Sequence, residues 1–194
     1  MEIGATKAVQ DRLKTTKIEE SKGASLVFCW DTHLTKIKGR NVLFIVNASN
    51  RYTIAMTDIE PRNWNYYAMY IIRVIHGMMQ EMGYSEDQIG QYFKMSGDTT
   101  VTKTHGRKSV GGINRMVMDA QYFGKKLEKE AKYQWELSEY LNRDICQPEG
   151  FDAYGYPNEL FKLDMERLGI ATKRKPAKVI DFAQYIENNR GTNH

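Results

Sequence analysis

One short stretch gathers most of the side chains that could do chemistry. From Thr104 to Ser109 the chain reads Thr-His-Gly-Arg-Lys-Ser, at the point where a strand-like run gives way to a helix. A histidine can donate or accept a proton near neutral pH, and arginine and lysine can stabilise the charge that develops on phosphate oxygens. His105, Arg107 and Lys108 are therefore candidate catalytic residues of a metal-independent ribonuclease.

The helix that follows would add a place for an anion. Ser109 is a candidate N-cap, and the first free N–H groups of a helix favour a negative charge. Asn114 and Arg115 lie in the same helix and are candidate contacts to RNA. The alternative is a surface turn followed by a capped helix, because one histidine beside basic residues is a common arrangement.

Other basic residues extend the candidate nucleic-acid surface. Arg51 lies in a turn between two predicted strands. It could approach the segment from Thr104 to Ser109 if the strands are neighbours; the alternative is that Arg51 is an ordinary turn residue. A basic segment near the C-terminus adds Lys173, Arg174 and Lys175. The net charge of +4 permits contact with phosphate but does not require it.

The histidines and cysteines show no metal-binding spacing. Asp31 and His33 lie two apart on one predicted strand face, so the carboxylate could orient the imidazole; a cross-strand hydrogen bond or a solvent-facing pair is the alternative. The four histidines are scattered, and Cys29 and Cys146 belong to no CxxC pattern. We therefore predict neither a metal nor a cofactor.

An aromatic loop offers a second kind of contact. Phe151, Tyr154 and Tyr156 fall in a segment rich in Gly and Pro, residues 147–157. Aromatic side chains give a large contact area at low entropy cost, so this loop could bind a protein partner or stack on bases. A loop packed back on its own domain fits the same pattern.

The spacing of apolar residues predicts an α+β fold with an antiparallel sheet covered by helices. Residues 1–5 form a short strand before a helix that begins after Thr6. The chain alternates between two faces from Ser25 to Thr35 and again from Tyr52 to Thr57, and Asn41 to Val46 is an almost unbroken apolar run typical of a central strand. Residues 25–58 therefore predict a three-stranded antiparallel meander, and residues 99–104 supply a further strand.

Further helices are indicated by apolar residues at helical spacing and by capping signals. They cover residues 61–83, a shorter segment opened by the capping-box pair Ser85 and Gln88, residues 109–145 with a break near Gly124, and residues 158–168. Residues 179–182 could form a last strand, and a tail from about residue 188 is expected to fray.

Length and composition indicate one cytoplasmic domain over residues 1–194. The chain is long enough to bury its own core. Its N-terminus lacks an apolar signal core, and no run approaches the roughly 20 apolar residues of a membrane span. Two distant cysteines suit a reducing compartment. We expect no membrane partner, and the sequence leaves the oligomeric state open.

Four motifs follow one another along nearly the whole chain. They are I-x-x-T-K-x-x-x-D-x-L from Ile3, the run from Trp30 that ends N-x-x-N-R-Y-T-I, T-K-T-H-G-R-K-S-V-x-x-I-N from Thr102, and Y-P-N-E from Tyr156. In this order they resemble a family of small bacterial and phage-type proteins known as a domain of unknown function, some of them linked with a plasmid open-reading-frame family. The resemblance implies a single α+β domain from bacteria or mobile elements, without an established activity, cofactor or catalytic residue.

The residues and the resemblance together predict an accessory protein that contacts RNA or a ribonucleoprotein complex through residues 105–115. In the setting that the resemblance implies, phage–host or plasmid conflict, it would cleave RNA without a metal or inhibit a nucleic-acid-guided defence complex, as an anti-CRISPR protein does. The alternative is a non-enzymatic, antitoxin-like module that binds a protein partner through the aromatic loop, the lysine-rich helix or the basic tail.

Overall fold

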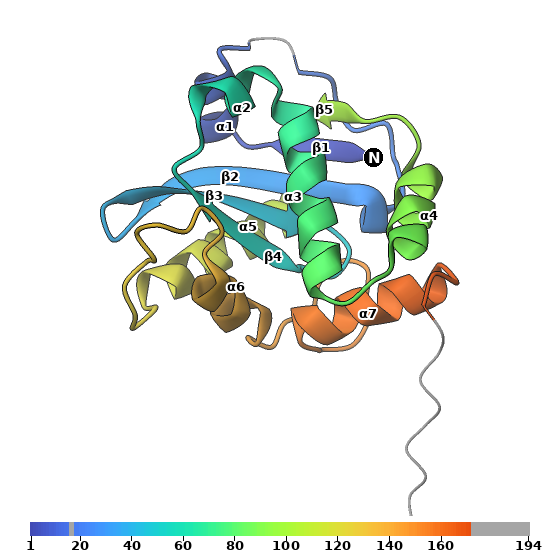
Figure 1. Cartoon of the computed structure of the whole chain (residues 1–194). Helices are drawn as coiled ribbons and strands as arrows, with labels where there is room; N and C mark the ends of the chain where they lie inside the picture. The colour runs from blue at the N-terminus through green and yellow to red at the C-terminus, as the bar shows by residue number, and fades with distance from the viewer. Residues whose placement is uncertain (16–17, 172–194) are drawn as a thin grey trace, which may run out of the picture.

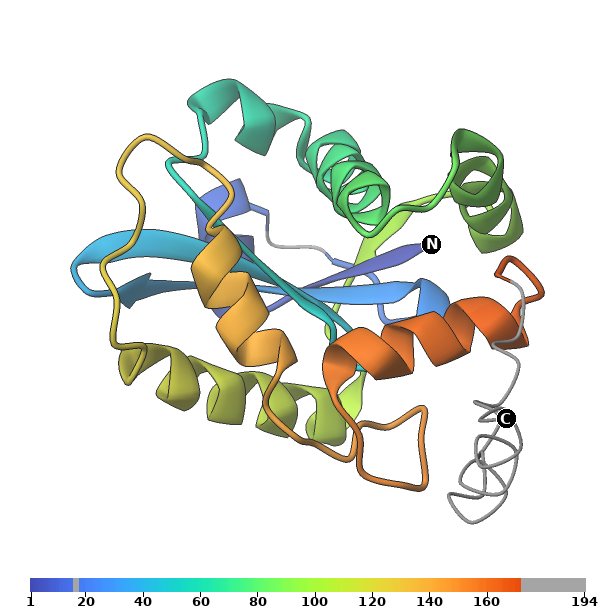
Figure 2. The same ribbon diagram turned by 60° about the horizontal axis from the view of Figure 1, so that its bottom comes forward.

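The computed structural model describes residues 1–15 and 18–171. Within these residues a five-stranded sheet lies between helices on both of its faces (Figure 1 and Figure 2). The strands are β1 (Glu2–Ala5), β2 (Cys29–Ile37), β3 (Arg40–Asn47), β4 (Thr53–Thr57) and β5 (Thr100–Thr102). Their order in the sheet is β4-β3-β2-β1-β5, and the predicted α+β class is confirmed.

The sheet is mixed, which corrects the prediction of an antiparallel sheet. Strands β2, β3 and β4 form the predicted antiparallel meander, but β1 runs parallel to both β2 and β5. A crossover that includes helix α1 (Lys7–Leu13) returns the chain from the end of β1 to the start of β2, so the two strands point the same way. Their register sets Glu2 beside Cys29 and Gly4 beside Asp31.

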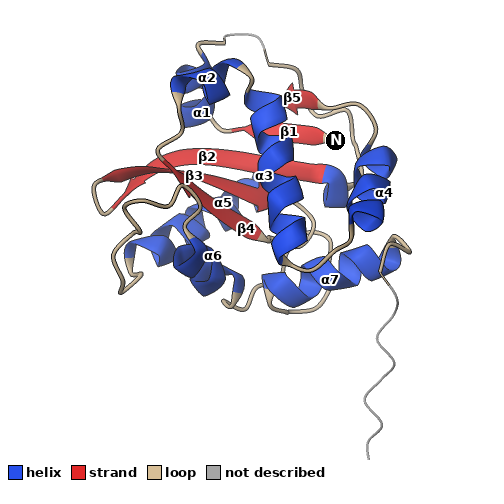
Figure 3. Ribbon diagram, in the orientation of Figure 1, coloured by secondary structure: helices blue, strands red, loops and turns tan. Residues whose placement is uncertain are grey.

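Helices cover the sheet on both sides, as the ribbon coloured by secondary structure shows (Figure 3). They are α2 (Pro61–Asn65), α3 (Tyr67–Glu81), α4 (Glu86–Ser96), α5 (Gly106–Gln121), α6 (Trp135–Asn142) and α7 (Pro157–Arg167), with a 3-10 turn η1 (Leu26–Phe28) before β2. Helix α3 crosses one face, and α5 and α6 lie on the other (Figure 2).

Successive side chains of the strands point to opposite faces of the sheet, and each face contributes to its own hydrophobic core. The larger core joins Trp30 and Ile45 to residues of α3, α4 and α7, among them Ile75 and Phe161. The second core joins Phe44 of β3 to residues of α5 and α6, including Ile113, Met116 and Leu137. Helix α5 is therefore fixed to the sheet by its apolar stripe, and its opposite stripe is left to solvent.

Some helices and strands begin or end at other residues than predicted, because local hydrogen bonds end an element where the spacing of apolar residues continues. The helix predicted over residues 61–83 divides at Tyr66, and the first strand of the meander begins as the turn η1. The break predicted near Gly124 is confirmed, since α5 ends at Gln121 and α6 begins at Trp135. The interruption is longer than predicted, and Gln134 holds the loop between the two helices: its Oε1 accepts from Glu128 N at 2.8 Å. The capping box of α4 is confirmed. Residues 179–182 and the tail from 188 lie outside the described residues.

Candidate functional site

His105 lies between two buried carboxylates at the start of α5. Its Nδ1 is 2.7 Å from Asp31 Oδ1, and its Nε2 is 2.9 Å from Glu2 Oε2. The side chains of His105, Glu2 and Asp31 are 3%, 5% and 0% exposed. Burial alone would lower the pKa of His105, but hydrogen bonds and charge from Asp31 and Cys29 raise that pKa to about 10. The ring therefore carries a proton on each nitrogen at neutral pH.

The two carboxylates are themselves held by further donors. Asp31 accepts the backbone N–H of His105, at 3.2 and 3.3 Å from its two oxygens, and the hydroxyl of Ser109. Glu2 accepts from Ser21 Oγ at 2.6 Å and from Lys22 N at 2.8 Å. Burial raises the pKa of Glu2, yet these two bonds and His105 outweigh it and leave that pKa below its usual value. The cluster is a fully hydrogen-bonded network.

Gly4 makes room for this network. A Cβ added at Gly4 would lie 1.8 Å from Asp31 Oδ1 and 3.1 Å from His105 Nδ1. Only a residue without a side chain allows the Asp31 carboxylate to reach the imidazole across β1. The space that Gly4 leaves on β1 is therefore the space that the Asp31 carboxylate occupies.

Of the two alternatives for His33, the structure shows a hydrogen bond to the neighbouring segment: its Nδ1 lies 3.2 Å from Thr6 Oγ1, just after β1, and Asp31 does not orient it. Residues two apart on a strand are about 7 Å apart, whereas His105 reaches Asp31 from a separate segment. Ser109 is not the N-cap of α5; that position is His105, and Ser109 lies in the first turn, where its hydroxyl donates to Asp31.

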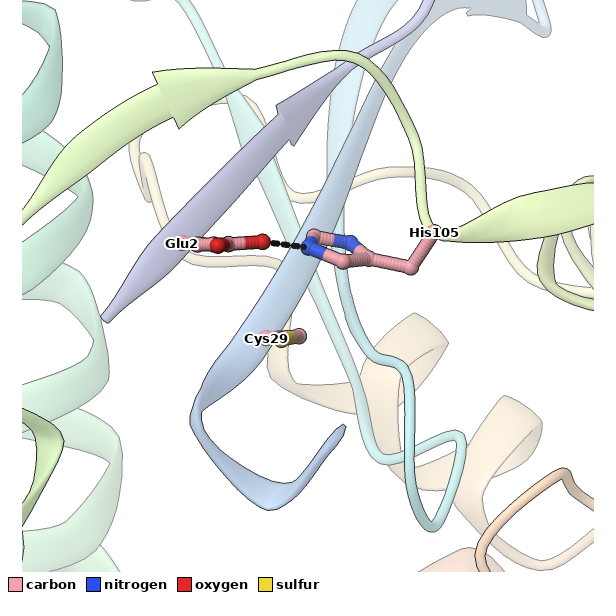
Figure 4. Close-up of side chains that lie close together, drawn as sticks. All are labelled: Glu2, Cys29 and His105. Carbon is pink, nitrogen blue, oxygen red and sulfur yellow. Dashed lines mark hydrogen bonds and ion pairs between the residues drawn. The ribbon is translucent and has the colours of Figure 1, made fainter. Parts of the chain in front are cut away.

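Cys29 completes a group of three side chains that could hold a metal ion. The ligand atoms of Glu2, Cys29 and His105 all lie within 4.8 Å of one another. Figure 4 shows them arriving from β1, from the start of β2 and from the segment before α5. The sequence analysis missed this group because its members are 27 and 76 residues apart in the chain. The sequence did offer one signal, because residues two apart on a strand point to the same face of the sheet. Glu2 and Gly4 share a face on β1, and Cys29 and Asp31 share that face on β2.

The solvent side of α5 carries two of the candidate catalytic residues and two of the candidate RNA contacts. Arg107, Lys108, Asn114 and Arg115 are all exposed. Lys108 Nζ lies 3.4 Å from Pro148 O, and Arg115 pairs with the carboxylate of Asp119 at 3.2 Å. Arg107 has no ion pair within the part of the chain that the structure describes.

Arg51 also reaches this helix. Its Nη2 donates to Gly112 O at 2.6 Å, and a Cβ at Gly112 would meet the Arg51 guanidinium. Arg51 thus braces α5 against the turn between β3 and β4. The predicted contacts Lys173, Arg174 and Lys175 lie outside the described residues.

The aromatic loop is divided between the core and the surface. Phe151 is buried, with the guanidinium of Arg167 over its ring at 3.9 Å, so this residue packs back on its own domain. Tyr154 and Tyr156 are 70% and 49% exposed. Of the three predicted partner contacts, only the two tyrosines face solvent.

Comparison with known proteins gives a family but no activity. Searches of curated proteins and of solved structures found no match. No helix within residues 1–15 and 18–171 has the length and apolar character needed to cross a membrane. The family profile described as Domain of unknown function (DUF6933) matches residues 2–160, which span every strand of the sheet and the whole buried cluster. The resemblance to an uncharacterised domain family is therefore confirmed, and the chain belongs to this family.

Proposed function

We propose that this protein contacts RNA through one exposed stripe of α5. The observation that carries the proposal is the combination of cations and an exposed aromatic ring at helical spacing. We call this stripe the α5 face; it comprises Arg107, Lys108, Asn114, Arg115 and Met118 of α5 together with Tyr122, the C-cap residue directly after the helix. Tyr122 is 79% exposed and Met118 is 58% exposed. Proteins that bind single-stranded nucleic acid combine positive charge along the backbone with aromatic side chains on which bases stack.

The two ends of the α5 face suit the two parts of a nucleotide. Arg107 and Lys108 lie in the first turn, where the helix dipole and free N–H groups favour phosphate. Tyr122 lies 15 residues further along, which is about 22 Å at 1.5 Å per residue. A strand of RNA laid along the helix would meet charge at one end and a stacking surface at the other.

The buried cluster supports this surface from below. Asp31 accepts from the His105 backbone and the Ser109 side chain, so it ties the first turn of α5 to β2. The first turn, which carries Arg107 and Lys108, is therefore held in a fixed position on the sheet.

Binding is better supported than cleavage. Both nitrogens of His105 face carboxylates and its ring is buried, so a phosphate would have to displace Glu2 or Asp31 to exchange a proton with it. The predicted role of His105, Arg107 and Lys108 in metal-independent RNA cleavage stays a prediction.

Replacing Arg107 and Lys108 together with Ala should weaken RNA binding about 100-fold or more, because each of the two charged hydrogen bonds is worth about 1.5 to 3 kcal/mol. Fluorescence anisotropy with labelled single-stranded RNA measures the loss. The slope of log K against log salt should also become shallower by about 1.4, from two phosphate contacts at about 0.7 each.

The matched control is the double variant Lys126→Ala and Lys129→Ala. It removes the same charge from exposed positions in the loop after α5, and it should bind RNA nearly as the unchanged protein does. If both double variants lost the same RNA affinity, the loss would reflect the net charge of the protein and not a contact made by Arg107 and Lys108. No loss at Arg107 and Lys108 would remove the α5 face from the proposal.

The proposed setting is phage–host or plasmid conflict in the cytoplasm. We infer the conflict setting from the sequence resemblance and the compartment from the cysteines. In this setting the ligand of the α5 face would be RNA within a nucleic-acid-guided defence complex. Cys29 and Cys146 are both free thiols, in keeping with a reducing compartment.

A second candidate function is protein binding through the aromatic loop. Cys146 and Gly155 form an antiparallel bridge, which places Ile145, 55% exposed, close to the exposed Tyr154 and Tyr156. An apolar and aromatic patch of this kind suits a protein partner. Such a module would keep its complex without Arg107 and Lys108 and would lose it without the two tyrosines.

A further inference from the structure

We propose that Glu2, Cys29 and His105 bind a zinc ion. A carboxylate oxygen, a thiol sulfur and an imidazole nitrogen lie within 4.8 Å of one another at the edge where β1 and β2 begin (Figure 4). Zinc accepts all three kinds of ligand, and sulfur with nitrogen selects it over magnesium or calcium. The proposal concerns a different part of the molecule from the α5 face and stands independently of RNA binding.

The spacing of the three groups is close to that of a tetrahedral zinc site. With zinc bonds of about 2.0 to 2.3 Å, ligand atoms lie about 3.3 to 3.8 Å apart. Glu2 Oε2 and His105 Nε2 are 2.9 Å apart in a hydrogen bond, and the most distant pair of ligand atoms is within 4.8 Å. Small side-chain rotations therefore suffice, because the strand register already fixes Glu2 beside Cys29.

The groups around the three ligands match those that support zinc sites. A metal-bound histidine almost always donates its other ring N–H to a carboxylate or carbonyl, and Asp31 takes that position at 2.7 Å from Nδ1. Ser21 Oγ and Lys22 N hold the Glu2 carboxylate in turn. The His105 ring is thus oriented with Nε2 toward Glu2 and Cys29.

The charge of the cluster also suits a cation. Glu2 and Asp31 place two buried carboxylates beside the site, and a buried carboxylate needs a compensating positive charge. Zinc binds a thiolate and a neutral imidazole nitrogen, so Cys29 Sγ and His105 Nε2 would be bound without their protons. Three protein ligands leave the fourth tetrahedral position to water.

The test is metal binding by the full-length protein, with Cys29→Ser as the main variant. The protein is stripped with a chelator, and Zn²⁺ is then titrated in competition with a chromogenic chelator. We expect about one equivalent of zinc per chain, with an affinity at least about 100-fold weaker in the variant, since loss of a ligand should exceed the loss from a supporting group. Co²⁺ in place of zinc should give a near-ultraviolet thiolate-to-metal absorption band that the variant lacks.

Two further variants keep the test decisive. Cys146→Ser removes the other free buried cysteine and should bind zinc and cobalt as the unchanged protein does. Glu2→Gln keeps the shape of the side chain but removes a charged ligand, and it should also weaken zinc binding; circular dichroism confirms that each variant is folded. The proposal fails if the unchanged protein takes up no zinc, or if folded Cys29→Ser and Glu2→Gln bind it as tightly. Anisotropy with RNA would report separately on the α5 face.

Discussion

Replacing Asp31 with Asn is expected to lower the free energy of unfolding of the metal-free protein by about 3 to 5 kcal/mol, the usual cost of breaking one side of a buried ion pair. Asp31 is 0% exposed and pairs with the protonated ring of His105. Asparagine has the same shape but presents one acceptor oxygen and one NH₂ group. If that NH₂ group faces the His105 backbone N–H, two donors meet. If it faces Ser109, the hydroxyl must turn to accept, and its bond to a charged acceptor is lost.

Urea unfolding in the presence of a chelator measures this loss, since the chelator keeps zinc from contributing to stability. Asp152→Asn is the matched control, because Asp152 is exposed and its backbone oxygen, which accepts from Gln147, is unaffected. The control should change stability by less than about 0.5 kcal/mol. If Asp31→Asn were as mild as the control, the buried network would not hold the start of α5.

Replacing Gly4 with Ala is expected to cost about 3 kcal/mol, at the upper end of the range for overpacking a core. The new Cβ would lie 1.8 Å from Asp31 Oδ1. The carboxylate cannot simply rotate away, because it accepts hydrogen bonds from His105 and Ser109 on the other side. The mutation should therefore displace the whole cluster by adding one methyl group.

The matched control for Gly4→Ala is Gly90→Ala, which makes the same substitution but is expected to change the free energy of unfolding in the opposite direction. Gly90 lies inside α4, is exposed, and has nothing within 4 Å of an added Cβ. Gly90→Ala should raise the free energy of unfolding by about 0.5 to 1 kcal/mol through helix propensity. Chemical unfolding of both variants gives the comparison, and an Ala at position 4 that is tolerated without loss would show that the Asp31 carboxylate lies elsewhere.

Much of the fold could be predicted because it follows from local patterns. Two alternating runs on either side of the apolar run Val42 to Val46 predict the meander of β2, β3 and β4, and this pattern is visible without knowledge of the rest of the chain. Ser85 and Gln88 predict the start of α4, because a capping box is complete within four residues.

The direction of β1 could not be predicted from such patterns. A strand of four residues carries no sign of its direction, which depends on the path of the crossover through α1 to β2. Gly124 indicates the break after Gln121, but the length of the loop that follows depends on Gln134, whose bond to Glu128 follows no apolar period.

The candidate site shows the same limit. His105, Arg107 and Lys108 stand out in the sequence because they are adjacent, and the structure keeps two of them on the surface and buries the third. The partners of His105 lie at positions 2, 29 and 31, so only the pairing of β1 with β2 brings them together. Gly4 gave no signal at all, because its role is to leave a space for Asp31.

RNA carrying 4-thiouridine, photo-crosslinked to the full-length protein and mapped by mass spectrometry after trypsin digestion, tests the RNA contact most directly. If RNA lies along the α5 face, the main crosslink should fall on the peptide from Met116 to Lys125, which carries Met118 and Tyr122. It should weaken when Arg107 and Lys108 are both replaced with Ala. Crosslinks confined to the peptide from Asp144 to Lys162, which carries Tyr154 and Tyr156, or the absence of any crosslink, would contradict RNA binding by α5.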